Sequence, residues 1–361
     1  MGEKFAANPI TGTGSMSVPI ATSPGRSGFG PQLSLSYDSG AGNGPFGFGW
    51  TLSLPSITRK TDKGLPQYFD AEDSDVFILS GAEDLVPVYR QDLDGTWVAG
   101  HPGFHRDADG FWVRDPAGRF VIHEDEIDGY RVRRYRPRIE GLFARIERWS
   151  KIGATSDVHW RSISKDNILT LYGFDANSRI ADPLDASRIF SWLICETRDD
   201  KGNAVLYRYK AEDGLGVDLG NAHERNRGPQ NDARRMANRY LKRIHYGNRT
   251  PLFDNAGPRP HFLDKPQIDT QIDNAGWMFE VVFDYGDHDA ATPKPNDDLA
   301  KDAAGLLKYP WNQRLDSFST YRSGFEVRTT RLCQRVLMFH HFSGEAGVGR
   351  DCLVCSTDFT Y

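Results

Sequence analysis

The sequence lacks the features that would cross-link the chain by disulfides or hold it in a membrane. It has four cysteines in 361 residues, too few for a disulfide framework. It has no apolar run long enough to span a bilayer, so we expect no direct membrane insertion. Its first residues, MGEKFAANPITGTGS, contain neither the apolar core of a signal peptide nor a myristoylation signal. We therefore expect a protein that is cytoplasmic before release and becomes extracellular by a route without a signal peptide.

Long runs with a helical period are also scarce. The 36 glycines and 20 prolines interrupt the chain often, while 39% of the residues are hydrophobic and 12% are aromatic. Short alternating segments between turn residues are typical of strands. We predict an all-β fold, in which many antiparallel hairpins form large twisted sheets and helix is rare. The formal net charge of -5 argues against a general nucleic-acid partner.

Residues 1–361 form one β-rich region in which composition changes near residue 59, and the sequence marks no reliable internal boundary. Residues 1–59 are rich in Gly, Ser and Pro and predict an opening hairpin, and residues 60–361 predict a series of hairpin sheets. DVFILSGAEDLVPVY predicts two strands joined at Gly81. Asp-Gly followed by an aromatic residue recurs in QDLDGTWV, RDADGFWV and DEIDGYRV, which favours tight hairpin turns. A longer turn is expected at residues 201–203.

Three further segments carry mixed signals. NDARRMANRYLKRI, from Asn231, favours a helix, although its second half alternates like a strand. TPKPNDDLAKDAAG, from Thr292, predicts a polar loop with one helical turn. FEVRTTRLCQRVLMFHHF, from Phe325, predicts one long strand or a bent pair. The loops over residues 214–232 and 247–274 are long enough to be functional or mobile.

A glycine-rich stretch, LSLSYDSGAGNGPFGFGWTLSLPS, contains the pattern G-x-G-x-x-G at Gly42, Gly44 and Gly47. This pattern binds a dinucleotide only where a strand, the glycine turn and a helix follow one another. The residues after Gly49 alternate as a second strand instead, so we expect no nucleotide cofactor. We predict that Gly42, Gly44, Gly47 and Gly49 permit unusual backbone angles and close packing. Trp50 is expected to anchor the core.

Two acidic turns resemble the beginning of a calcium-binding loop. They are DLDG, from Asp92, and DADG, from Asp107. An EF-hand also needs a bidentate glutamate at its twelfth position and flanking helices, and neither follows here. Hairpin turns account for these residues. A weak calcium site of another kind stays open.

Four potential zinc ligands lie near the end of the chain. They are His340 and His341, followed by Cys352 and Cys355. The segment RDCLVCSTDFTY alternates like a strand, so the odd spacing places the two thiols on opposite faces. The adjacent histidines diverge for the same reason. We therefore predict structural thiols and surface histidines, with no metal.

Charged residues are concentrated in one hairpin. YRVRRYRPR, from Tyr130, mixes arginines with aromatic residues, as a nucleic-acid site would. The acidic stretch HEDEID precedes it, and across a hairpin the two would neutralise each other. Glu124 and Glu126 also spell the E-x-E pair of many ADP-ribosyltransferases, but no Ser-Thr-Ser strand precedes them. There is no G-x-S-x-G, H-E-x-x-H or P-loop motif. We nominate no catalytic residue and predict no enzymatic activity.

Longer strings carry a family resemblance. GTGSMSVPIATSPGRSGFGPQLSLSYDSGAGNGPFGFGWTLSLPSITRK closely resembles the opening of the SpvB/TcaC family. Further matches run along the chain, among them RIFSWLICETRDDKGNAVLYRYK, ANRYLKRIHYGNR, FEVVFDYGDHD and YRSGFEVRTTRLCQRVLMFHHF. The family comprises virulence-plasmid B proteins and the B components of insecticidal toxin complexes. The resemblance covers essentially every residue, and it concerns the N-terminal region of the family only.

The resemblance implies a role in assembly. In toxin complexes of this type, the B component and an Rhs-repeat C component form two halves of a hollow β-sheet shell around a cytotoxic segment. A propeller in the B component docks on the pore-forming A component. In the virulence-plasmid protein, the same region precedes a separate ADP-ribosyltransferase domain. The hairpin around DDKGNAVLYRYK also resembles Rhs-type units, which fits an Rhs-like shell.

The sequence thus predicts a non-enzymatic structural module of a toxin-complex B component, whose sheets help to contain and deliver a toxic cargo in virulence. Its expected partners are the Rhs-repeat C component and the pore-forming A component. Two alternatives stay open. The first is the N-terminal delivery region of an ADP-ribosyltransferase toxin. The second is an adhesin-like module that binds glycans.

Overall fold

The computed structural model of the chain describes residues 4–8, 12–80, 84–92, 104–107, 110–113, 117, 120–252 and 265–361. Strands make up 44% of the structure and helices 6%, which confirms the predicted all-β fold with little helix. Among the described residues, no helix is long and apolar enough to cross a membrane.

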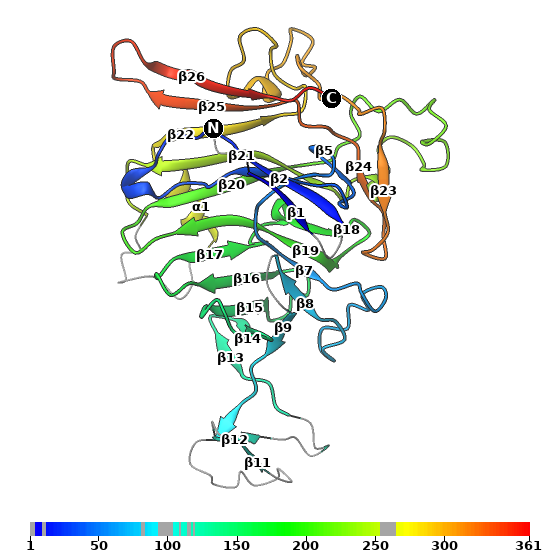
Figure 1. The fold of residues 1–361 in the computed structure, drawn as a ribbon, viewed down its shortest axis with the longest axis vertical. Coiled ribbons are helices and arrows are strands. Elements are labelled where there is room, and N and C mark those ends of the chain that lie inside the picture. The colour runs from blue at the N-terminus through cyan, green and yellow to red at the C-terminus, as the bar shows by residue number, and fades with distance from the viewer. Residues whose placement is uncertain are drawn as a thin grey trace.

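Fifteen strands form one large antiparallel sheet (Figure 1). They are β7 Ser56–Arg59, β8 Phe77–Leu79, β9 Asp84–Pro87, β13 Glu124–Ile127, β14 Tyr130–Pro137, β15 Arg145–Lys151, β16 Val158–Ile163, β17 Leu169–Tyr172, β18 Arg179–Asp182, β19 Asp185–Arg198, β20 Ala204–Ala211, β21 Arg239–Asn248, β22 Trp277–Asp284, β25 Arg335–Phe342 and β26 Gly349–Asp358.

Part of this sheet closes on itself. Strand β17 pairs with β16 on one side and with β19 on the other, and the path β16-β15-β14-β9-β8-β7 returns to β19. We call these eight strands the ring. Beyond β19 the sheet leaves the ring and continues as β20-β21-β22-β25-β26, so that β26 forms its last edge. The long strand β19 is the junction, because different stretches of it pair with β7 and with β20.

Aromatic side chains fill the interior of the ring. Phe77 lies 5.0 Å from Trp160 and 5.7 Å from Trp192, measured between ring centroids, and Tyr135 lies 4.8 Å from Trp160. Edge-to-face contacts of this kind add to the stabilisation from burial. The alternation of inward and outward residues along each strand therefore produces a packed ring rather than an open channel.

The smaller sheets lie at the margins of the large one. An N-terminal sheet has the order β1-β2-β3-β6, and three short sheets contain the remaining strands. Their bounds are β1 Lys4–Asn8, β2 Thr13–Pro19, β3 Ser34–Asp38, β4 Asn43–Gly44, β5 Gly47–Phe48, β6 Trp50–Leu52, β10 Gln91–Asp92, β11 Phe104–Asp107, β12 Gly110–Val113, β23 Phe318–Thr320 and β24 Val327–Thr329.

The N-terminal sheet packs on the part of the large sheet outside the ring. Leu33 and Leu35 belong to the same buried cluster as Ile244 of β21 and Val281 of β22. The hydroxyl of Tyr246 donates to the carbonyl oxygen of Ser23 at 2.6 Å, which fixes the approach of the N-terminal segment.

In the described ranges helices are few and short. They are α1 Lys265–Asp273 and the 3-10 turns η1 Arg26–Gly28, η2 Ala176–Ser178, η3 Ala233–Arg235 and η4 Asp297–Leu299. The helix predicted from Asn231 is wrong, because it is reduced to η3, whose first turn is capped by Asp232. The strand-like alternation of the second half is confirmed by β21. Strand pairing with β20 and β22 overrides the local helical preference there.

The loop predicted over residues 247–274 is also wrong in part, because it contains α1. Ile272 of this helix packs against Leu171, Cys195 and Leu206 of the large sheet. The single helical turn expected after Thr292 is present as η4. The segment from Phe325 contains two successive strands, β24 and β25, rather than one long strand.

The predicted hairpins β8–β9, β11–β12, β13–β14 and β19–β20 are confirmed. The turn residues Gly81, Asp94, Gly95 and Asp109 lie outside the described residues. The division of the chain into an opening hairpin and hairpin sheets stays a prediction.

Candidate functional site

The glycine-rich segment joins the N-terminal sheet to the end of the chain. Buried Phe46 makes edge-to-face contacts with Phe283 of β22 and with Phe359, at centroid distances of 6.3 and 6.2 Å. The carbonyl oxygen of Pro45 accepts from the backbone N–H of Cys333 at 2.8 Å. The hydroxyl of Tyr361 donates to the carbonyl oxygen of Cys333 at 2.7 Å. Residues far apart in sequence therefore meet around this segment.

The four glycines of this segment differ in what they require. Gly47 and Gly49 have φ values of +92° and +80°, which side chains rarely adopt. A Cβ at Gly49 would lie 2.6 Å from the ring of Tyr37, and one at Gly44 would lie 3.3 Å from the carbonyl oxygen of Trp50. A Cβ at Gly42 would meet nothing within 4 Å, and the φ of Gly42 is not positive. Gly42 therefore needs neither an unusual backbone angle nor close packing, the two reasons that the sequence predicted for these glycines.

Trp50 is half-buried rather than fully enclosed. Its ring lies 5.2 Å from that of Tyr37, and it packs against the edge of the main hydrophobic cluster. The segment itself is the short hairpin β4–β5 followed by strand β6. This is not the strand, turn and helix that a dinucleotide-binding motif requires.

An apolar cavity of about 420 Å³ lies beside the segment. Val18, Leu35, Phe46, Trp50 and Phe359 contribute to its wall. At its border the side chains of Phe48 and Tyr361 are 65% and 59% exposed.

The last strand, β26, is an exposed edge. Among the described residues it pairs only with β25, so one side of its ten-residue backbone is unpaired. Leu353 and Val354 are exposed on it. An unpaired strand edge can pair with another chain, although charges and bulges such as those on β26 weaken that tendency.

The predicted separation of the two thiols on β26 is wrong. Cys352 lies opposite His340, and Cys355 lies opposite Met338, with a register shift at Val354 between them. Because Val354 is the extra residue of this bulge, Cys352 and Cys355 both lie on the face of the sheet that carries Met338. The adjacent histidines diverge as predicted: His340 contacts Ser23 and His341 contacts Glu280. Absence of a metal stays a prediction.

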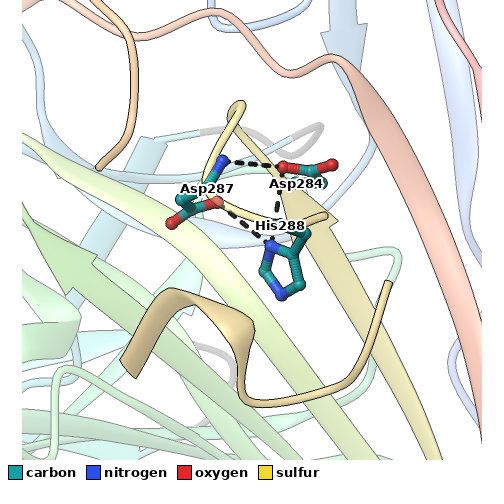
Figure 2. Close-up of side chains that lie close together, drawn as sticks. All are labelled: Asp284, Asp287 and His288. Carbon is teal, nitrogen blue, oxygen red and sulfur yellow. Dashed lines mark hydrogen bonds and ion pairs between the residues drawn. The ribbon is translucent and has the colours of Figure 1, made fainter. Parts of the chain in front are cut away.

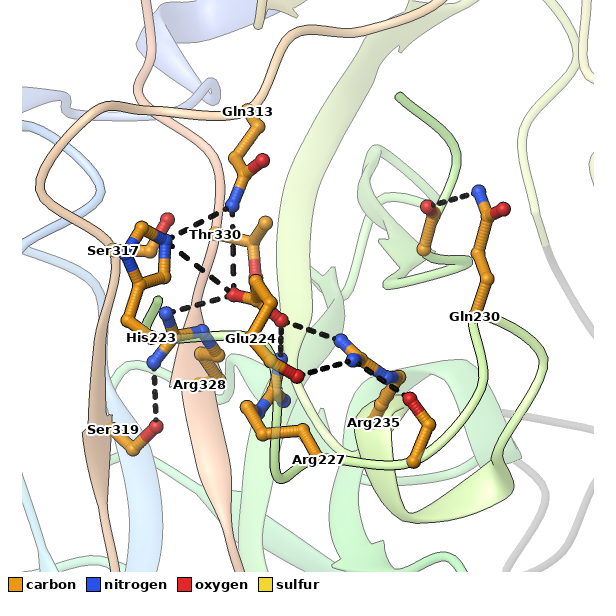
Figure 3. Close-up of polar contacts among 12 residues, drawn as sticks. His223, Glu224, Arg227, Gln230, Arg235, Gln313, Ser317, Ser319, Arg328 and Thr330 are labelled. Atoms are coloured by element: carbon orange, nitrogen blue, oxygen red, sulfur yellow. Dashed lines mark hydrogen bonds and ion pairs between the residues drawn. The ribbon is translucent and has the colours of Figure 1, made fainter. Parts of the chain in front are cut away.

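A buried carboxylate organises the loop over residues 214–232 (Figure 3). Oε2 of Glu224 accepts from Arg227 at 2.7 Å and from Arg235 at 2.6 Å, and its Oε1 lies 2.8 Å from Arg328 of β24. Burial would raise the pKa of Glu224, but the hydrogen bonds from Arg235 and Arg227 outweigh it and lower that pKa. The loop, which its length had marked as functional, is therefore fixed by ion pairs against β24. Sequence spacing gave no signal of this set.

A second buried set lies at the end of β22 (Figure 2). Nδ1 of His288 is 3.3 Å from Asp287 and 3.5 Å from Asp284, close enough for the three side chains to surround a metal ion. The oxygens of Asp287, however, already accept from Lys242 at 2.8 Å and from Lys210 at 3.1 Å. Burial would raise the pKa of Asp287, but His288 and the two lysines hold that pKa well below its usual range. Both oxygens of Asp287 thus already face an ammonium group, so the set is an ion-pair cluster in this structure.

The charged hairpin is paired as predicted. Glu124 lies opposite Arg133 and Glu126 opposite Arg131 across β13 and β14. Nε of Arg133 donates to Glu124 at 2.6 Å. Both E-x-E carboxylates therefore lie opposite arginines of the neighbouring strand.

The comparisons with known proteins agree with this architecture. The family model described as Salmonella virulence plasmid 65kDa B protein matches residues 8–342. The chain belongs to the SpvB family. It is 36% identical over 353 residues to the mono(ADP-ribosyl)transferase SpvB of Salmonella typhimurium, covering 96% of this chain and 51% of the relative. The SpvB of Salmonella dublin is also 36% identical, with 50% of its length covered. The chain thus spans about half the length of these curated relatives.

Solved structures extend the likeness to toxin complexes. The N-terminal domain of the effector protein SpvB from Salmonella typhimurium strain LT2 is similar with a TM-score of 0.65 and 33% identity, covering 96% of this chain and 98% of that domain. The crystal structure of TcdB2-TccC3 is similar with a TM-score of 0.70 and 29% identity, covering 99% of this chain but 15% of the other. A Photorhabdus luminescens Tc holotoxin pore is similar with a TM-score of 0.69 and 28% identity, covering 14% of its chain. The SpvB-family fold therefore occurs both as a separate domain and within much longer toxin chains.

Proposed function

We propose that this chain is a non-enzymatic structural module of a toxin-complex B component, which forms part of a β-sheet shell around a toxic cargo. The open edge of β26 carries the proposal. The ring closes one end of the sheet path, while the other end exposes Leu353 and Val354 on a backbone that is unpaired among the described residues. A sheet built in this way is suited to continue into further strands. The likeness to TcdB2-TccC3 supports the same role.

The partners follow from this role. We propose that the module assembles with an Rhs-repeat C component and, through that assembly, serves a pore-forming A component. We also propose that it is released from the cell with its cargo. The structures of TcdB2-TccC3 and of a Tc holotoxin pore support toxin-complex partners in general.

A second function is favoured by the curated relatives. The match to about half of a mono(ADP-ribosyl)transferase supports a role as the delivery region of such a toxin. In that case the chain would carry a transferase rather than enclose a cargo with an Rhs-repeat partner. Both functions leave this chain without a catalytic role of its own.

Light scattering coupled to size exclusion tests the first function. We expect the chain alone to self-associate or to be poorly soluble, because its edge is open. Co-expression with an Rhs-repeat partner should give one monodisperse complex. A stable monomer with no affinity for that partner would contradict the shell role. If a fusion of this chain to a C-terminal transferase were exported from the cell in that case, the delivery role would be the correct one.

A further inference from the structure

A histidine connects three strands at the open edge of the sheet. His341 of β25 places Nε2 3.0 Å from Oε2 of Glu280 on β22, and Nδ1 2.8 Å from Oδ1 of Asp351 on β26. Strand β25 lies between β22 and β26. The imidazole therefore spans from the interior of the sheet to its last strand.

The number of protons on this imidazole decides how many contacts it makes. A carboxylate oxygen can only accept a hydrogen bond, so both ring nitrogens of His341 must donate if both contacts are to hold. Only the imidazolium has two N–H groups, and a neutral ring has one. Burial would lower the pKa of His341, but the hydrogen bonds and charges of Glu280 and Asp351 outweigh it and raise that pKa.

The two carboxylates are not equal partners. Glu280 is 5% exposed and also faces Arg243, at 2.8 Å, and His245, at 3.4 Å. Asp351 is 41% exposed, and besides His341 its one ion-pair partner within the described part of the chain is Arg350, at 3.9 Å. Water can replace a hydrogen bond to the exposed carboxylate but not one to the buried carboxylate. On deprotonation the remaining N–H therefore stays with Glu280, and the contact with Asp351 is lost.

The surroundings of His341 contain further charges that bear on its proton. Arg249 of the segment after β21 donates to the His341 carbonyl oxygen at 3.2 Å, and Asp298 pairs with Arg243 behind Glu280. His340, the neighbour on β25, faces the other side and contacts Ser23 at 2.6 Å. Burial lowers the pKa of His340, so its neutral form is favoured. The pKa values of the two adjacent histidines are therefore shifted in opposite directions, so His340 loses its proton at a lower pH than His341.

Asp351 is also a strained point of the edge strand. Its φ is +63°, in the left-handed region that non-glycine residues rarely occupy. The ladder between β25 and β26 shifts register between His340 and Phe342. Regular pairing is thus already interrupted where His341 holds the strand, so this contact matters more than one within a continuous ladder.

We propose that His341 is a proton-controlled latch on the β25–β26 hairpin. As the imidazolium it ties Asp351 of β26 to Glu280 of β22. As the neutral imidazole it releases Asp351, and the tip of the hairpin loosens while the remainder of the sheet stays folded. The edge that is open for assembly is then ordered at lower pH and more mobile at higher pH.

Hydrogen exchange tests the latch. Protection factors of the amides over residues 349–355 are measured from about pH 5.5 to about pH 9, alongside the NMR titration of the imidazoles. We expect protection to fall about tenfold as His341 loses its proton, and amides of β21 to be unaffected. Protection that is independent of pH, or an imidazole of His341 that is neutral throughout, would overturn the latch.

Three variants separate the latch from general destabilisation. His341→Gln and Asp351→Gly should each show the low protection at every pH, because the first removes the titrating ring and the second removes the carboxylate at a positive φ that glycine tolerates. His340→Gln is the matched control on the neighbouring residue and should keep the pH step. A pH step that survives in His341→Gln, or is lost in His340→Gln, would assign the effect to another group.

Discussion

Nη1 of Arg235 lies 2.6 Å from Oε2 of Glu224, and both side chains are almost completely buried, at 4% and 1% exposure (Figure 3). The pair connects the loop over residues 214–232 to the residues just before β21. A buried charge of this kind is tolerated only because its partners are in place.

Replacement of Glu224 by alanine should destabilise the protein by about 3–5 kcal/mol, because it leaves Arg235 and Arg227 buried without their shared carboxylate. Urea unfolding measures the change in the free energy of unfolding. Asp166→Asn, at an exposed turn, is the control and should be close to neutral. An equally small effect of Glu224→Ala would contradict the role of the pair.

The same carboxylate should make the protein sensitive to acid. The pKa of Glu224 is lowered in the folded protein, so its stabilisation is present above the unfolded value of 4.5 and is lost as pH falls through the folded pKa. Glu224→Gln should therefore reduce the loss of stability on acidification, measured as the difference in unfolding free energy between neutral and acidic pH. If the variant lost as much unfolding free energy on acidification as the unmodified protein, other carboxylates would be responsible for the acid sensitivity.

The glycine-rich segment allows a matched comparison. Gly49→Ala should cost more than about 1 kcal/mol, because it combines a positive φ with a Cβ only 2.6 Å from the ring of Tyr37. Gly42→Ala should be nearly neutral, because nothing lies within 4 Å of its added Cβ. Thermal unfolding of the two variants checks this order. Equal effects would mean that the segment is not fixed by packing at Gly49.

Local patterns were sufficient to predict many of the strands and the hairpin pairs β8–β9, β11–β12, β13–β14 and β19–β20. The alternation in LSLSYD and WTLSLPS predicts β3 and β6, and acidic and basic strings predict the facing strands β13 and β14. These signals work because both partners of a hairpin lie close together in the sequence. The prediction failed for Cys352 and Cys355, because a bulge at Val354 changes the alternation without any distinct residue to mark it.

Contacts between distant segments could not be predicted in the same way. Arg59 is buried among ring strands, where it bonds to Asp70 at 2.6 Å and to Asp75 at 2.7 Å. In the sequence it is an ordinary charged residue at the end of a strand. Its burial follows from the closure of the ring through β17 and β19, a pairing that depends on the whole chain.

The E-x-E residues should not support ADP-ribosyl transfer. Glu126 lies opposite Arg131 in the hairpin β13–β14, where the arginines of β14 offset the acidic strand. The purified chain should label no actin with radioactive NAD and should release no nicotinamide. Labelling that disappears in Glu126→Ala would establish a transferase in this region.

A charged residue on the open edge should reduce self-association. Val354 is 51% exposed on β26, and a lysine on an edge strand disfavours pairing with a second edge, because the charge would have to be desolvated. Val354→Lys should therefore keep the chain monomeric at concentrations at which the unmodified chain associates, while the unfolding free energy changes by less than about 0.5 kcal/mol. Val76→Lys, on a valine that is 40% exposed before β8, is the matched control and should associate like the unmodified chain. Light scattering at several concentrations separates the three proteins. If both lysine variants were monomeric, net charge rather than the edge would control association, and if neither were, the contact would lie elsewhere on the surface.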